Sequence, residues 1–109
     1  MTIRPNKNAA DGMTLYIDQD LEAIVPGFLE NRRRDVQTLE TALQKNNLAQ
    51  IELIGHRMSG DGGGYGFDAI STMGAALEQA AAREDRDAIS RHIAELIDFL
   101  DRVTVVYRR

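Results

Sequence analysis

Cysteine is absent from this chain of 109 residues. Its absence excludes disulfides, thiolate zinc sites, iron–sulfur clusters and cysteine nucleophiles. Long apolar runs are missing as well, because none approaches the roughly 18 residues that cross a membrane. The basic excess usual in nucleic-acid-binding proteins is also missing, since the formal net charge is −4. We therefore expect a cytoplasmic protein that binds neither a membrane nor nucleic acid.

Aromatic residues are sparse too, with three phenylalanines, three tyrosines and no tryptophan. No alternating run is long enough to predict a sheet, whereas apolar residues recur at helical spacing along most of the chain. A polar stretch precedes the first of them. We therefore predict a single all-α domain, with a flexible leader over residues 1–17 and a helical bundle over residues 18–109.

The apolar periodicity predicts one short helix and four longer ones. The short helix covers residues 18–24, and the longer ones cover about 26–45, 48 into a glycine-rich segment, 68–83, and 85 or 87 to 106. Pro26 suits the first turn of a helix, and Asn46 and Asn47 suit the end of that helix and the cap of the next. Short connections favour antiparallel neighbours, so we expect an up-down four-helix bundle with a short extra N-terminal helix.

Most of the nine glycines lie in one segment, Leu53 to Phe67, which also contains His56. Dinucleotide-binding and P-loop patterns both fail there, because Tyr65 and Phe67 stand where glycines are needed and the P-loop lysine is missing. The segment therefore calls for a structural interpretation, and two are open.

In the first interpretation, glycines at 60, 63 and 66 recur every three residues and stay near one side of a continuing helix. Small residues there let two helices approach, or leave a surface open beside the histidine. In the second, Gly62 to Gly64 end the helix in a left-handed cap, and Tyr65 and Phe67 anchor the turn in the core.

His56 falls on the outer side of its predicted helix. At about 100° per residue, the apolar positions of this helix define a core direction from which His56 points roughly 145° away. We therefore expect an exposed imidazole. Its neighbours on the helix surface include the small Gly60 and also Glu52, whose carboxylate would accept a hydrogen bond from one ring nitrogen and leave the other more nucleophilic.

Other polar features receive simpler interpretations. His92 falls at the edge of the apolar stripe of the last helix, as an ordinary half-exposed residue. No third nitrogen or thiolate ligand accompanies the two histidines, and no carboxylate spacing indicates a metal site. The basic run from Arg32 to Arg34 fans around its helix, which favours a solvated surface; help in binding an anion or a partner is the alternative.

The segment HRMSGDGGGYGF, with DAISTMGAALEQAA after it, resembles the histidine phosphotransfer (HPt) domain. The family pattern is H-x-x-K-G, then glycines three and six residues further on, then an apolar helix that ends in Leu-Glu. The corresponding positions in this chain are His56, Gly60, Gly63, Gly66 and Leu77-Glu78. The likeness extends over about residues 18–107.

The resemblance implies a phosphoryl carrier that has no kinase activity of its own and needs no metal or cofactor. His56 would accept a phosphoryl group from a receiver-domain aspartate and pass it to another receiver. The expected partner is a response-regulator receiver domain or a hybrid histidine kinase, and the carrier is expected to be a monomer. Ser59 and Gly60 would shape the site, and Glu52 would support it by orienting the ring.

Ser59 departs from the family pattern, which has lysine at this position. A lysine one turn from the ring would neutralise phosphoryl charge, whereas a serine hydroxyl brings no positive charge. Arg57 lies about 100° round the helix and is poorly placed to replace it, and Arg33 or Arg34 would have to reach across from the neighbouring helix. The alternative function is therefore an HPt-like binding module that docks a receiver domain without efficient phosphotransfer.

Overall fold

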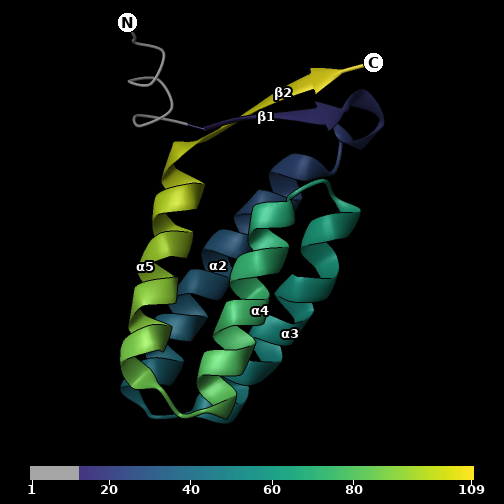
Figure 1. Cartoon of the computed structure of the whole chain (residues 1–109). Helices are drawn as coiled ribbons and strands as arrows, with labels where there is room; N and C mark the ends of the chain where they lie inside the picture. Colours follow the sequence, from purple (N-terminus) through teal and green to yellow (C-terminus); the bar gives the residue numbers. More distant parts are fainter. Residues whose placement is uncertain (1–12) are drawn as a thin grey trace, which may run out of the picture.

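The computed structural model describes residues 13–109. In this part of the chain four long helices form a bundle, and a two-stranded sheet lies across one end of it (Figure 1). The elements in chain order are β1 (Met13–Asp18), η1 (Gln19–Leu21), α2 (Val25–Gln44), α3 (Leu48–Gly64), α4 (Asp68–Ala82), α5 (Arg86–Arg102) and β2 (Val103–Arg108). The predicted four-helix bundle is confirmed.

The long helices begin close to the predicted residues because local capping signals are present. Pro26 lies in the first turn of α2. Asn47 caps α3 and Asp85 caps α5, each by accepting a hydrogen bond from a backbone N–H in the first turn. Asn46 and Glu84, with φ of 57°, follow α2 and α4 in the left-handed conformation that ends many helices.

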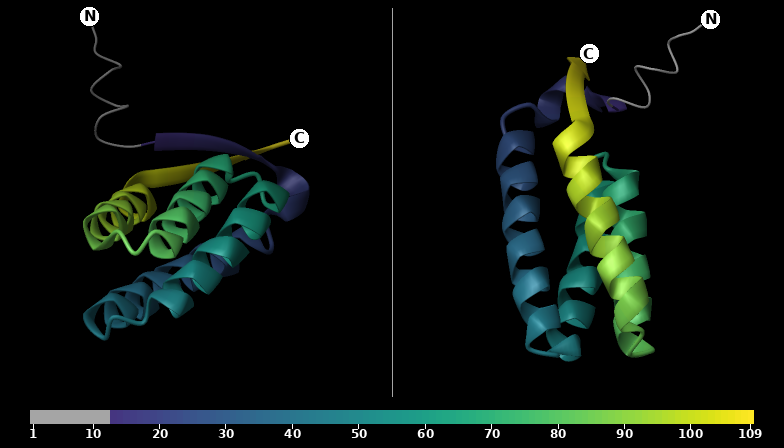
Figure 2. Two further views of the ribbon diagram at one scale, coloured as in Figure 1. Left: turned by 60° about the horizontal axis from the view of Figure 1, so that its bottom comes forward. Right: turned by 90° about the vertical axis from the view of Figure 1, so that its left-hand side faces the viewer.

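The four helices enclose one apolar core. Connections at 45–47, 65–67 and 83–85 are short, so consecutive helices run antiparallel. Figure 2 shows α4 and α5 as one layer and α2 and α3 as the other. The largest fully buried side chains come from every long helix and from the turn before α4: Val25, Leu39, Ile51, Met58, Phe67, Ile70, Leu77, Ile89 and Leu96. No helix within residues 13–109 has the length and apolar character needed to cross a membrane.

Helices α3 and α4 pack backbone against backbone. A Cβ added to Gly55 would lie 2.7 Å from the carbonyl oxygen of Gly74, and one added to Gly74 would lie 2.6 Å from the backbone nitrogen of Ser59. A Cβ on Gly62 would lie 2.5 Å from the backbone nitrogen of Ser71. These distances are too short for any side chain, so the three glycines set the spacing of the two helices.

The end of α3 differs from the predicted cap. The left-handed residue is Gly66, with φ of 82°, and not one of Gly62 to Gly64, which are still helical. The anchoring prediction is confirmed: Phe67 is fully buried, and the rings of Tyr65 and Phe67 lie 4.5 and 5.2 Å from that of Phe28.

The two-stranded sheet corrects the prediction that the chain contains no sheet. β1 and β2 pair in parallel, from Met13 opposite Val103 to Asp18 opposite Arg108. Residues 13–17 therefore belong to a strand and not to a flexible leader, and the rest of the predicted leader lies outside the described residues. Ile17 is buried, which joins this strand to the core of the bundle.

The same sheet changes both ends of the predicted helical region. The short helix expected over residues 18–24 is replaced by the end of β1 and the single 3₁₀ turn of η1. The last helix ends at Arg102 instead of Val106, because the β-branched run VTVV that follows favours an extended backbone.

Candidate functional site

His56 lies on the outer face of α3, as the helical spacing predicts. Its side chain is 72% exposed. The imidazole therefore stands clear of the core, and the prediction of an exposed ring is confirmed.

The ring is held from the neighbouring helix. Nδ1 of His56 lies 3.1 Å from Oε2 of Glu78, which projects from α4 and is 32% exposed. A carboxylate can only accept a hydrogen bond, so the proton of the neutral imidazole resides on Nδ1 in this contact. Nε2 then keeps its lone pair and is the nucleophilic nitrogen. Such a contact orients the ring and selects its tautomer at the same time.

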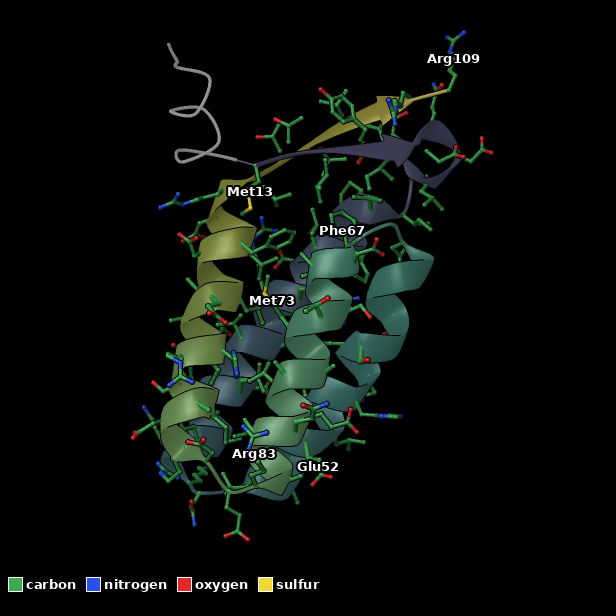
Figure 3. The ribbon with its side chains drawn as sticks, viewed as in Figure 1. Met13, Glu52, Phe67, Met73, Arg83 and Arg109 are labelled. Carbon is green, nitrogen blue, oxygen red and sulfur yellow. The ribbon has the colours of Figure 1, made fainter. Side chains whose placement is uncertain are left out.

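Glu78, and not Glu52, is therefore the partner of the ring. Glu52 borders the same shallow depression, the histidine hollow, which is lined by Ala49, Glu52, Leu53, His56 and Glu78. Figure 3 shows Glu52 toward the end of the bundle that lies away from the sheet. A helical wheel reveals neighbours on one helix only, so it could not show Glu78. The contact depends on how closely α4 packs on α3, which Gly55 and Gly74 determine.

The surface of α3 on the C-terminal side of His56 is bare. A Cβ added to Gly60, Gly63 or Gly64 would have nothing within 4 Å. Ser59 is half-buried, and its carbonyl oxygen accepts a hydrogen bond of 2.5 Å from the hydroxyl of Ser71. The glycines at 60 and 63 therefore leave the surface open, which is one of the two structural roles that their spacing indicates.

Arg33, one of the arginines considered as a substitute for the missing lysine, and its neighbour Arg32 are directed elsewhere. Arg33 donates a hydrogen bond of 3.4 Å from Nη2 to the carbonyl oxygen of Leu100, so it faces α5. Nε of Arg32 lies 2.9 Å from Asp35, and its guanidinium lies 4.8 Å from the centre of the Phe28 ring. Both side chains thus interact away from the histidine hollow.

Arg57 also belongs to a different group of charges. Burial raises the pKa of Asp35 above its ordinary value, while the positive charges of Arg32 and Arg57 oppose that shift and Asp61 adds to it. Arg32 reaches Asp61 as well, at 3.9 Å. This network, the α2–α3 charge cluster of Arg32, Asp35, Arg57 and Asp61, lies between the two helices. Simple spacing did not reveal it.

His92 is a half-buried residue on α5 with a local partner. Its Nδ1 lies 2.9 Å from Oε1 of Glu95 on the same helix, and its side chain is 21% exposed. This agrees with the interpretation of His92 as an ordinary boundary residue. Over the described range, no three or more His, Cys, Asp or Glu side chains are grouped so as to hold a metal ion.

Comparison with known proteins gives one match. The family model of the Hpt domain matches residues 23–104, a range that includes all four long helices, His56 and Glu78. Comparisons with curated proteins and with solved structures found no match. The matched range covers most of the chain, and the bundle and its exposed histidine agree with it. The chain therefore belongs to the Hpt domain family, the phosphotransfer modules of two-component signalling.

Proposed function

We propose that this protein accepts a phosphoryl group on Nε2 of His56 from a receiver-domain aspartate and passes it to a second receiver. One observation carries the proposal. The exposed ring has its Nδ1 held by Glu78, and the helix surface beyond it is bare at Gly60 and Gly63. The partner is accordingly a response-regulator receiver domain or the receiver domain of a hybrid histidine kinase.

In the loading step, the lone pair of Nε2 attacks the phosphorus of the aspartyl phosphate. The phosphorus–oxygen bond to the aspartate breaks, and its electron pair stays on the departing carboxylate. A phosphorus–nitrogen bond forms, and the positive charge that develops on the ring is balanced by the Glu78 carboxylate, which accepts a hydrogen bond from Nδ1–H. This proton stays in place throughout the step.

In the unloading step, a carboxylate oxygen of the next receiver attacks the same phosphorus. The phosphorus–nitrogen bond breaks, and its electron pair returns to Nε2. Attacking and leaving atoms lie roughly in line in such a transfer, so the partner must reach the side of the ring that faces away from Glu78. Gly60 leaves that approach free, and the exposed Leu53 gives the partner an apolar contact one turn before the histidine.

The remaining predicted site residues have supporting roles in this proposal. Ser59 and Gly60 shape the surface beside the ring, one as a half-buried small residue and the other as open backbone. Glu52 lies at the rim of the histidine hollow and contributes negative charge there, while the orienting role assigned to it from the sequence passes to Glu78.

The test is transfer of radiolabelled phosphate from phosphorylated receiver domains of the same genome in the presence of Mg²⁺. We expect label on the wild-type protein and on His92→Gln, which removes the other histidine, but none on His56→Gln. Equal labelling of His56→Gln would remove His56 from the reaction. Binding of a receiver to the wild-type protein without any label would favour the alternative of a docking module.

A further inference from the structure

In the described part of the chain, the histidine hollow is lined by negatively charged side chains and by no positively charged one. The histidine hollow has two carboxylates, Glu52 and Glu78, and within residues 13–109 no lysine or arginine lines it. Ser59 stands where the family pattern has lysine. Arg33 faces α5, and Arg32 and Arg57 belong to the α2–α3 charge cluster. Over the described residues, the lining of the histidine hollow therefore offers no basic side chain to a phosphoryl group on Nε2.

Such a phosphoryl group needs neutralisation. It carries about 1.5 to 2 negative charges near neutral pH. The charge of Glu78 is offset by the positive charge of the phosphorylated ring, whose Nδ1–H donates a hydrogen bond to it, whereas the carboxylate of Glu52 adds to the negative charge of the hollow. In a water-like medium, a unit charge roughly 6 Å from this group changes its stability by about three- to tenfold.

Resting on the proposed function, we propose that this site holds its phosphoryl group weakly, because two carboxylates and, among the described residues, no basic side chain line the histidine hollow. The free phosphorylated protein is then a poor store of phosphate. The phosphoryl group moves readily to an acceptor aspartate, which gives this carrier a forward bias in the relay.

A competition for phosphate measures this property directly. Wild-type protein is mixed with an equal amount of Ser59→Lys, both are loaded with potassium phosphoramidate, and a trace of receiver domain with Mg²⁺ exchanges the phosphoryl group between them. Intact-mass spectrometry then gives the phosphorylated fraction of each. We expect the lysine variant to hold the phosphoryl group about tenfold more favourably, and the advantage to shrink as added salt screens the charges.

Two further competitions complete the test. Ser90→Lys makes the same chemical change at an exposed position on α5 and should share phosphate equally with the wild type. Glu52→Gln should gain about threefold, because it removes a negative charge from the hollow. Equal sharing between the wild type and Ser59→Lys would overturn the inference while leaving the relay intact. A complete lack of exchange with every receiver would instead count against the proposed function.

Discussion

Glycines have opposite roles on two faces of helix α3. On the face toward α4, Gly55 and Gly62 are buried, and any Cβ there would collide with backbone atoms of the neighbouring helix. On the face toward solvent, Gly60 and Gly63 have open space around them. One set brings two helices together, and the other keeps a surface clear. The glycine-rich segment is therefore neither a flexible loop nor a phosphate cradle.

The packed face also determines the chemistry of the open one. Gly74 lies one turn before Glu78 on α4, and a Cβ on Gly55 would lie 2.7 Å from the backbone nitrogen of Glu78. Close helix packing thus brings the Glu78 carboxylate to Nδ1 of His56. Any change that separates the helices should weaken this contact as well as the fold.

The largest effect is expected on the packed face. Gly74→Ala places a methyl group 2.6 Å from the backbone nitrogen of Ser59, so the helices must shift. We expect the free energy of unfolding to fall by about 1–3 kcal/mol, the usual cost of overpacking. Gly60→Ala should raise it by about 0.5–1 kcal/mol, because alanine favours the helix and meets nothing. Urea denaturation measures both free energies of unfolding. Changes of the same sign in the two variants would contradict the distinction between the packed and the open face.

A bulky residue on the open face should separate stability from function. Gly60→Gln keeps the helix stable but places a side chain where the receiver approaches. We expect the rate of phosphotransfer to fall by about ten- to a hundredfold, since small displacements of reacting groups have effects of this size. Transfer assays with Gly60→Ala as the matched control test this. A glutamine variant that transfers at the wild-type rate would show that the open flank is not the docking route.

The two carboxylates of the histidine hollow should also behave differently. Glu78→Gln removes the charge that supports the Nδ1 proton, and we expect transfer to slow by about three- to tenfold. Glu52→Gln makes the same change without touching the contact at Nδ1, so its rate should stay within about twofold of the wild type. Equal losses in single-turnover transfer assays would argue against Glu78 as the orienting residue.

The smallest effect concerns the α2–α3 charge cluster. Burial raises the pKa of Asp35, so the folded protein holds this proton more tightly than the unfolded chain does. Stability from this group is present at pH below the ordinary aspartate pKa and is lost as pH rises through the raised value. Asp35→Asn should flatten this part of the curve of unfolding free energy against pH. An unchanged curve would contradict the raised pKa of Asp35.

Most of the helical fold follows from local sequence signals, and the sheet does not. Pro26, Asn47 and Asp85 each lie at the start of a long helix, so these starts can be read from the local sequence. The pairing of Met13–Asp18 with Val103–Arg108 joins segments at opposite ends of the described chain. Each strand is short, and β2 continues directly from a helix, so neither gives a clear local signal.

The candidate site shows the same division. The exposure of His56 depends on the geometry of one helix, which the wheel captures. The identity of its partner depends on the register between two helices, which a wheel of one helix cannot show. The wheel therefore predicts Glu52, whereas the structure has Glu78. Likewise, the spacing of the glycines predicts which of them share a face of α3, but not which face packs against another helix. That distinction required the position of Gly74 on α4.

The central claim is that Nε2 of His56 carries the phosphoryl group while Nδ1 keeps its proton against Glu78. Phosphorus–nitrogen correlation spectroscopy of the ¹⁵N-labelled, phosphorylated protein tests it most directly. The account predicts a single phosphorus signal coupled to Nε2 of His56, with the proton retained on Nδ1. Coupling to Nδ1 of that ring, or to His92, would contradict it.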